Sequence, residues 1–176
     1  MNKALIILDA QYGIIENNFK NEINNIHKLI KYCKKHNLPV ISIKHIDNDP
    51  ESRIYCNSNK GNIEKYIMEH SSIIIEKNSP NIFRESTLKK YLSENNIEQL
   101  IICGFNAEYC CLFTSIIGES LGFKITYIED ATGSSNNGDT YEMKDLDIVD
   151  FVGCVLDWSG IIEILYLKEF EEKYDK

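Results

Sequence analysis

The sequence predicts an α/β fold, a three-layer αβα arrangement in which helices cover both faces of a doubly wound, mostly parallel sheet of about six strands. Two observations predict this class. Short, nearly continuous apolar runs recur along the chain, as expected for strands that are buried on both faces. Between them lie segments whose apolar residues are spaced by three and four, the period of an amphipathic helix. Strands that alternate with helices in this way form a parallel sheet with right-handed crossovers.

Six apolar runs provide the expected strands. The first, "ALIIL", meets an aspartate at once, and the fifth, "GFKITYIED", also ends on an acidic residue. The run "FVGCVL" is taken as the sixth, and "IIEILYL" follows it as a short further segment. The expected strands cover residues 4–8, 40–45, 71–77, 98–104, 122–130 and 151–156.

The segments between the strands carry the helical pattern. Ser86 or Thr87 is expected to cap the second of these helices, because a hydroxyl side chain can accept a hydrogen bond from a free amide of the first turn. Residues 61–70 are expected to form a poorer helix or a loop. The clear helical patterns cover residues 19–33, 86–96 and 108–121.

Length and composition indicate one domain, residues 1–176, that is long enough to bury a full core. The formal net charge is −8 and no basic stripe occurs, so nucleic acid is not an expected partner. The first apolar stretch is too short for a signal peptide or a membrane span. These features, with six cysteines in a chain of this size, favour reduced thiols and a cytoplasmic location.

Five of the cysteines are interpreted by their surroundings. Cys33, Cys103 and Cys154 read as core residues, because a free cysteine behaves as a small hydrophobe. Cys111 reads as a buried packing thiol on the inner face of its helix, and Cys56 as an exposed, incidental one.

Reactive side chains follow three of the expected strands. Asp9 follows the first strand and Lys77 ends the third, while the fourth leads through Gly104 to Cys110 at the start of a helix. In open parallel sheets, ligands bind beyond the carboxyl ends of the strands. A carboxylate, an ammonium and a thiol are therefore expected to converge at one edge of the sheet.

This trio has a coherent chemistry. The helix N-terminus and Lys77 are expected to lower the pKa of the Cys110 thiol from its ordinary value of roughly 8.5. Asp9 would take the thiol proton as general base, and Lys77 would keep that carboxylate ionised. Backbone N–H groups of the turn before the helix could hold a developing oxyanion.

Three segments also carry a family resemblance. "ALIILDAQ" places Asp9 and Gln11 in an Asp-x-Gln pattern, and "IEKNSPNIFRESTLKKYL" places Phe83 six residues after Lys77. In "LIICGFNAEYCCLF", Cys110 follows the glycine by six residues. In this order the segments resemble the isochorismatase-like cysteine hydrolases, which include nicotinamidases, N-carbamoylsarcosine amidase-like enzymes and isochorismatases.

The resemblance implies a mechanism and its residues. Cys110 would be the nucleophile that forms a thioester, with Asp9 as base and Lys77 as the third member of the triad. The substrate would be a small amide or carbamoyl compound. The oxyanion hole maps to the amides of Asn106 and Cys110, next to a cis peptide bond expected between Phe105 and Asn106.

Four residues are candidates to line the substrate pocket: Gln11, Phe83, Tyr109 and Trp158. For Trp158, simple packing or a contact with another subunit is equally expected. The family favours a homo-oligomer, a dimer or larger, and no cofactor is predicted for this chain.

The chain departs from its relatives at two places. Ala107 stands where many amidases of the family have threonine; isochorismatases often have alanine there but lack the cysteine nucleophile. Nicotinamidases carry a metal site built on Asp-x-His with further histidines. Here His45, Asp47 and Asp49 read as a polar turn, so no metal is predicted and a generic amidase is preferred to a nicotinamidase.

Other functions remain open at this stage. A binding or scaffold protein without activity, or a vinyl-ether hydrolase of the isochorismatase type, could use the same fold. A redox pair of Cys110 and Cys111 would need a strained ring, since the residues are adjacent. A flavodoxin-like nucleotide binder would need a phosphate loop, whereas "DAQYGIIENN" holds one glycine.

Overall fold

A parallel sheet of six strands organises the molecule in the computed structural model, which describes residues 1–16 and 18–175. The strands are ordered β3-β2-β1-β4-β5-β6, and all neighbouring pairs run parallel. This confirms the predicted α/β class. The strands are β1 (Asn2–Leu8), β2 (Val40–His45), β3 (Ile73–Lys77), β4 (Ile97–Phe105), β5 (Lys124–Gly133) and β6 (Glu163–Leu165).

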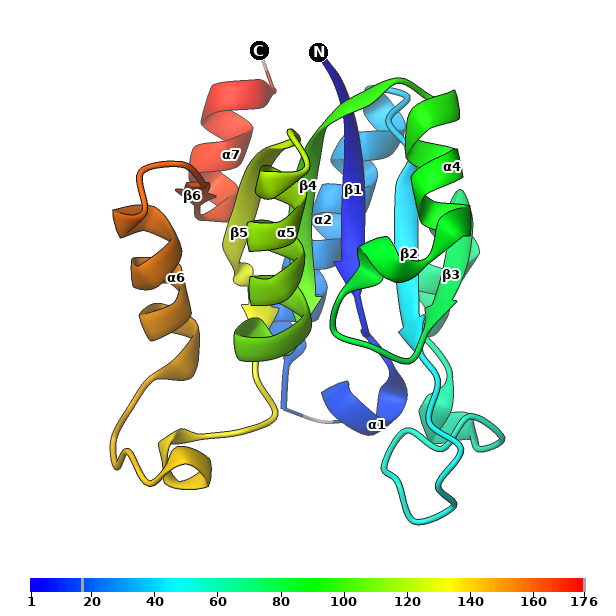
Figure 1. Cartoon of the computed structure of the whole chain (residues 1–176), viewed down its shortest axis with the longest axis vertical. Coiled ribbons are helices and arrows are strands. Elements are labelled where there is room, and N and C mark those ends of the chain that lie inside the picture. Colours follow the sequence, from blue (N-terminus) through cyan, green and yellow to red (C-terminus); the bar gives the residue numbers. More distant parts are fainter. Residues whose placement is uncertain (17, 176) are drawn as a thin grey trace.

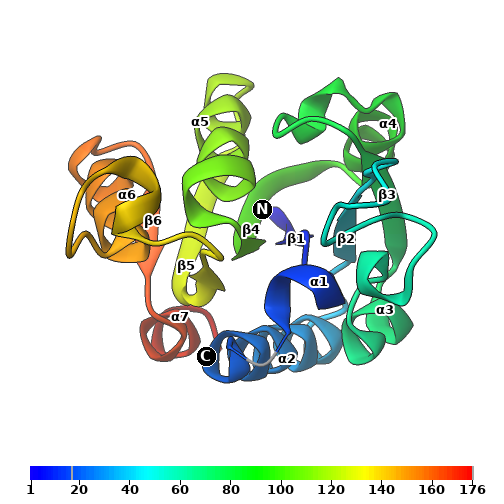
Figure 2. The same ribbon diagram turned by 90° about the horizontal axis from the view of Figure 1, so that it is seen from below.

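Helices cover both faces of the sheet (Figures 1 and 2). On one face lie α2 (Lys20–Lys35), α3 (Lys65–His70) and α7 (Leu167–Tyr174). On the other lie α4 (Ser86–Glu94), α5 (Leu112–Ser120) and α6 (Ile148–Trp158). The shorter elements are α1 (Tyr12–Ile15), η1 (Asn59–Gly61), η2 (Ile82–Arg84), η3 (Ala107–Cys111) and η4 (Gly138–Tyr141).

The strand β1 shows why the apolar runs are continuous. Leu5 and Ile7 belong to the apolar cluster on the α2 side, while Ile6 and Leu8 belong to the cluster on the α4–α5 side. All four side chains are at most 1% exposed. Because successive side chains point to opposite faces, a strand that is covered on both sides needs apolar residues at every position.

The expected sixth strand at residues 151–156 is wrong, because this segment lies inside α6. One face of the helix, with Val152 and Leu156, is buried against the sheet. The opposite face is apolar as well, so the helical period is hidden and the run reads as a buried strand. Cys154, expected in the core, is exposed on that outer face. The sixth strand is β6, farther along the chain.

Smaller differences concern the ends of elements. The N-cap of α4 is Glu85 and not Ser86 or Thr87, and no side chain accepts a capping hydrogen bond there. Residues 61–70 contain the short helix α3, which the Glu64 side chain caps by accepting a hydrogen bond from the Ile67 amide. Within the described part of the chain, no helix has the length and apolar character needed to cross a membrane.

Candidate active site

The ends of three strands bring together the three side chains that the sequence singled out. Asp9 directly follows β1, Lys77 is the last residue of β3, and Cys110 lies in η3 after β4. The Lys77 Nζ atom donates hydrogen bonds to Asp9 Oδ2 at 2.7 Å and to Cys110 Sγ at 3.2 Å. Asp9 is 2% exposed, Lys77 is 3% exposed and Cys110 is 7% exposed. An acid, an amine and a thiol therefore share one buried site.

Local backbone conformation allows this meeting. Gly104 has a φ of +115°, and a Cβ atom there would lie 2.2 Å from the carbonyl oxygen of Leu8. Only glycine lets β4 approach β1 this closely. Asp9 itself has a φ of 47°, a left-handed conformation that aspartate tolerates better than most residues. The chain thus turns sharply out of β1 at the residue that carries the carboxylate.

Of the predicted oxyanion residues, Asn106 directly precedes a π-helical turn and Cys110 lies within it. The peptide bond Phe105–Asn106 is cis, as the resemblance implied. After it, η3 holds one π turn, in which the Cys111 amide donates to the Asn106 carbonyl at 3.2 Å. The Asn106 side chain accepts from the Ser135 amide at 3.1 Å and donates to its hydroxyl at 3.0 Å. The loop after β5 is thereby tied to the start of η3.

The charges of the site keep Lys77 protonated and the thiol neutral. Burial lowers the pKa of Lys77, but Asp9 and Cys110 outweigh it and raise that pKa above its ordinary value. Burial raises the pKa of Cys110 to about 12; the Asp9 charge adds to this rise and Lys77 opposes it. The expectation that the helix end and Lys77 would lower the thiol pKa is therefore not met. The resting thiol therefore holds its proton.

Asp9 has a free position for that proton. Its Oδ2 atom binds Lys77, whereas Oδ1 is buried and has no hydrogen-bond partner among the residues that the structure describes. A buried acceptor without a partner costs free energy in the resting protein. The Oδ1 atom can therefore accept a proton from the thiol or bind a polar atom of a substrate.

His45 is a member of this cluster that the sequence interpretation missed. Its Nδ1 atom lies 3.1 Å from Lys77 Nζ, and the two residues are register partners at the ends of β2 and β3. Burial and then the Lys77 charge lower the pKa of His45, against the opposing charges of Asp9 and Asp47. The signal was available, because His45 ends an expected strand at the same edge as Lys77.

The predicted pocket residue Gln11 binds backbone groups of two neighbouring segments. It is completely buried. Its Nε2 atom donates to the carbonyls of His45 at 3.0 Å and Gly61 at 2.8 Å, and its Oε1 atom accepts from the His45 amide at 2.9 Å. Through these bonds Gln11 holds the end of β2 against the turn after β1.

Phe83 lies in the apolar layer between α4 and α5. Its ring stacks on Phe123 with centroids 5.9 Å apart and packs near Gly118, about two helical turns beyond Cys110. Phe83 also borders a surface cavity at the edge of the sheet where β1 and β4 begin.

Tyr109 is 42% exposed on η3 and belongs to a polar network. Its hydroxyl lies 2.8 Å from the Tyr141 hydroxyl, which donates to Glu108 Oε1 at 3.0 Å. The same Glu108 oxygen accepts from Ser134 Oγ at 2.9 Å and Asn136 Nδ2 at 2.8 Å. The segment after β5 is therefore fastened over the turn that carries Cys110.

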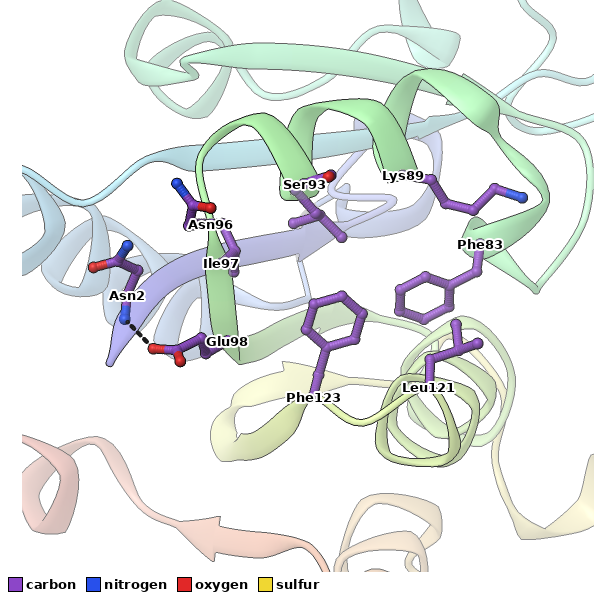
Figure 3. A pocket seen from close by; sticks show the side chains of 10 residues that line it. Asn2, Phe83, Lys89, Ser93, Asn96, Ile97, Glu98, Leu121 and Phe123 are labelled. Atoms are coloured by element: carbon purple, nitrogen blue, oxygen red, sulfur yellow. Dashed lines mark hydrogen bonds between the residues drawn. The ribbon is translucent and has the colours of Figure 1, made fainter.

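A surface cavity of about 620 Å³ lies away from this chemistry (Figure 3). Its lining includes Asn2, Ile97 and Phe123, which mark the amino-terminal ends of β1, β4 and β5. Asp9, Lys77 and Cys110 lie at the opposite, carboxyl edge. No group of three or more His, Cys, Asp or Glu side chains within residues 1–16 and 18–175 is arranged to hold a metal ion.

Comparisons with known proteins match the chain to one family. The family model described as "Isochorismatase domain" matches residues 3–158. Nicotinamidase 3 of Arabidopsis thaliana is 24% identical over 147 residues, which are 76% of this chain and 74% of that protein. The fold is shared with two crystal structures. A cysteine hydrolase from Pseudomonas syringae has a TM-score of 0.82 at 17% identity and covers 96% of this chain and 90% of its own. An isochorismatase from Pseudomonas putida has a TM-score of 0.79 at 23% identity and covers 96% and 89%.

Proposed function

Because the chain belongs to the isochorismatase domain family of hydrolases, we propose that it is a cysteine-dependent hydrolase that cleaves a small amide or carbamoyl compound. One observation carries the proposal: the ammonium of Lys77 lies within hydrogen-bond distance of both the Asp9 carboxylate and the Cys110 sulfur. A buried thiol beside a carboxylate and a fixed cation has what nucleophilic catalysis requires. The three groups also lie where parallel sheets bind their ligands, beyond the carboxyl ends of the strands.

The first half of the reaction makes a thioester. Asp9 takes the thiol proton as the sulfur of Cys110 attacks the carbonyl carbon and forms a C–S bond. The amides of Asn106 and Cys110 are the candidates to hold the oxyanion that develops. When the C–N bond breaks, protonated Asp9 gives its proton to the leaving nitrogen, so ammonia or an amine departs.

Water completes the turnover. Asp9, ionised again, accepts a proton from a water molecule as its oxygen adds to the thioester carbon. The C–S bond then breaks, the acid is released, and the proton returns from Asp9 to the sulfur of Cys110. Lys77 stays protonated in both halves, which agrees with its raised pKa, and stabilises the anionic sulfur each time it forms.

The amide class is favoured by the chemistry of the site and by the relatives. A raised thiol pKa suits an enzyme that creates its thiolate only during attack, with the base and the substrate both in place. One curated relative is named a nicotinamidase, which acts on an amide. A vinyl-ether hydrolase would need no thiol nucleophile, so the two activities separate when the sulfur is removed.

A substrate panel with variants tests the proposal. Small amides and carbamoyl compounds are screened for ammonia release with the wild type, with Cys110→Ala, and with Cys154→Ala as a matched control. We expect release by the wild type and the control and none by Cys110→Ala, with an acyl adduct on Cys110 found by mass spectrometry after rapid quenching. Full activity of Cys110→Ala would exclude covalent catalysis by this cysteine.

A further inference from the structure

The ammonium of Lys77 has three N–H groups and three partners. They are Asp9 Oδ2 at 2.7 Å, His45 Nδ1 at 3.1 Å and Cys110 Sγ at 3.2 Å. We propose that His45 is the positioning residue of Lys77: it accepts one N–H and thereby fixes another on the sulfur of Cys110. The proposal deepens the proposed function, since it takes Cys110 as the nucleophile.

The geometry requires one state of the imidazole. An ammonium has no lone pair, so Nδ1 of His45 must accept and its proton must lie on Nε2. The groups that face the ring favour this neutral form: burial and Lys77 lower its pKa, and Asp9 and Asp47 oppose them less. The thiol of Cys110 is held neutral by burial. The ring therefore stays an acceptor throughout the neutral range of pH.

The backbone of His45 is fixed as firmly as its ring. Gln11 binds both the amide and the carbonyl of His45, at 2.9 and 3.0 Å. His45 also pairs with Lys77 in the β2–β3 register. A rigid strand end thus holds the acceptor nitrogen of His45 in place, as expected for a residue that orients another side chain.

Loss of the acceptor should affect the sulfur and not the ion pair. A charge-assisted hydrogen bond is about twice as strong as a neutral one, so an ammonium with an unpaired N–H keeps its bond to the Asp9 carboxylate. The weaker contact, to Cys110 Sγ, is the one released when the ammonium rotates to find a new acceptor. The thiolate then loses its stabilising donor.

Isosteric variants test this with the full chain. His45→Asn carries its side-chain oxygen near the position of Nδ1, whereas His45→Gln carries it near Nε2 and His45→Ala carries none. The measurement is the rate of Cys110 alkylation by iodoacetamide as a function of pH, with the labelled peptide identified by mass spectrometry. We expect His45→Ala and His45→Gln to be about tenfold slower than the wild type at a fixed alkaline pH, and His45→Asn to stay within about twofold.

Equal rates in all three variants, or His45→Asn behaving as His45→Gln, would overturn the proposal. Nitrogen-15 NMR of the wild type gives a reading that does not depend on a variant's folding: a neutral ring protonated on Nε2 is expected, and a ring protonated on Nδ1 contradicts it. Alkylation needs no substrate. If the variants show the expected alkylation rates but the wild type hydrolyses no compound of the panel, the proposed function is refuted and the role of His45 stands.

A second feature, independent of the site, is the outer face of α6. Phe151, Cys154, Val155 and Trp158 follow one another at helical spacing and form what we call the α6 stripe. Phe151, Val155 and Trp158 are 51%, 46% and 89% exposed, and Ile161 beyond the helix is 59% exposed. A helix that is apolar on both faces is normally buried on both. We infer that the α6 stripe packs against the α6 stripe of a second copy of this chain.

The exposed area matches what such a contact needs. A large aromatic side chain buries about 150–250 Å², so the stripe and Ile161 offer roughly 500 Å² of apolar surface at these exposures. A standard interface buries about 800 Å² per partner, of which a little more than half is apolar, or about 450 Å². One stripe is enough for a two-fold interface, because the same patch serves both partners.

Charge predicts how this contact responds to salt. Asp150 and Asp157 lie exposed beside the stripe, and the chain has a net charge of −8. Two copies that meet through α6 bring these carboxylates together. Since salt screens repulsion between exposed charges, association should tighten as ionic strength rises.

Sedimentation equilibrium tests the inference on the wild type, on Trp158→Glu and on Met68→Glu, a control on the opposite face of the sheet with a residue 45% exposed. We expect dimers of the wild type and of the control, and monomers of Trp158→Glu. Trp158 is the single tryptophan, so its emission should shift to shorter wavelength as the wild type associates. Two results would overturn the inference. One is a wild type that stays monomeric at high protein and salt concentrations, which is expected if a different protein covers this face. The other is a Trp158→Glu variant that still forms dimers.

Discussion

Replacing Lys77 with methionine should cost about 3–5 kcal/mol of the free energy of unfolding. Lys77 Nζ and Asp9 Oδ2 are 2.7 Å apart, and the two side chains are 0% and 3% exposed. At an effective dielectric constant of about 20, two unit charges at this distance attract each other by about 6 kcal/mol, and desolvation of both groups offsets part of it. Methionine keeps the apolar length but leaves the carboxylate buried without a counter-ion, a loss of about 3–5 kcal/mol in comparable cases.

A double-mutant cycle with Asp9→Asn gives the measurement. Urea unfolding is followed by circular dichroism for both single variants and the double variant, and the double should be less destabilised than the sum of the singles, by about 2 kcal/mol or more. Lys90→Met is the control, because Lys90 and Glu94 form an exposed pair at 3.8 Å that should contribute less than about 0.5 kcal/mol. Additive single effects, or a Lys77→Met loss as small as that of the control, would refute the buried ion pair.

Three further outcomes follow from the same site. The free energy of unfolding should fall as pH rises from about 9 towards 12, because the folded state holds the proton of Cys110 after the unfolded chain has released it. The raised pKa of Lys77 acts in the same direction, and urea titrations of Cys110→Ala should show a shallower fall. Gln11→Met removes three buried hydrogen bonds and should lower the unfolding midpoint in urea by an amount equivalent to about 1–3 kcal/mol; an unchanged midpoint would show that the clamp contributes nothing. Gly104→Ala should yield little folded protein on expression, since its Cβ would lie 2.2 Å from the Leu8 carbonyl oxygen, and a wild-type melting curve would contradict that geometry.

The sheet was predictable where its strands are buried on both faces, as β1 is, because such strands appear as short, continuous apolar runs. The error at α6 has the same origin. A helix whose outer face carries Phe151, Val155 and Trp158 in addition to its core face has only a narrow polar side, with Asp150 and Asp157, and this hides its period. The real sixth strand, Glu163–Leu165, is too short to show any pattern. Local sequence cannot distinguish a core strand from a helix with a second apolar face.

The candidate site was predictable in its reactive groups and not in its supports. Asp9 and Lys77 could be found because each ends an apolar run, and the edge rule for parallel sheets brings such ends together. The structure gives Gln11 a place between two strand ends, which no spacing rule supplies. The direction of the Cys110 pKa was missed because it depends on burial, and burial belongs to the folded chain as a whole.

The strand order explains why a histidine belongs in this cluster. In the order β3-β2-β1-β4, Asp9 and Cys110 follow adjacent strands, while Lys77 follows a strand two places from β1, or about 10 Å away. Only a long side chain can cross that distance, and it must pass over the end of β2, where His45 lies. The Lys77 side chain is itself buried, so it needs an acceptor at that strand end, since an unpaired N–H would cost free energy. The lysine reaches the sulfur because the intervening strand supplies that acceptor.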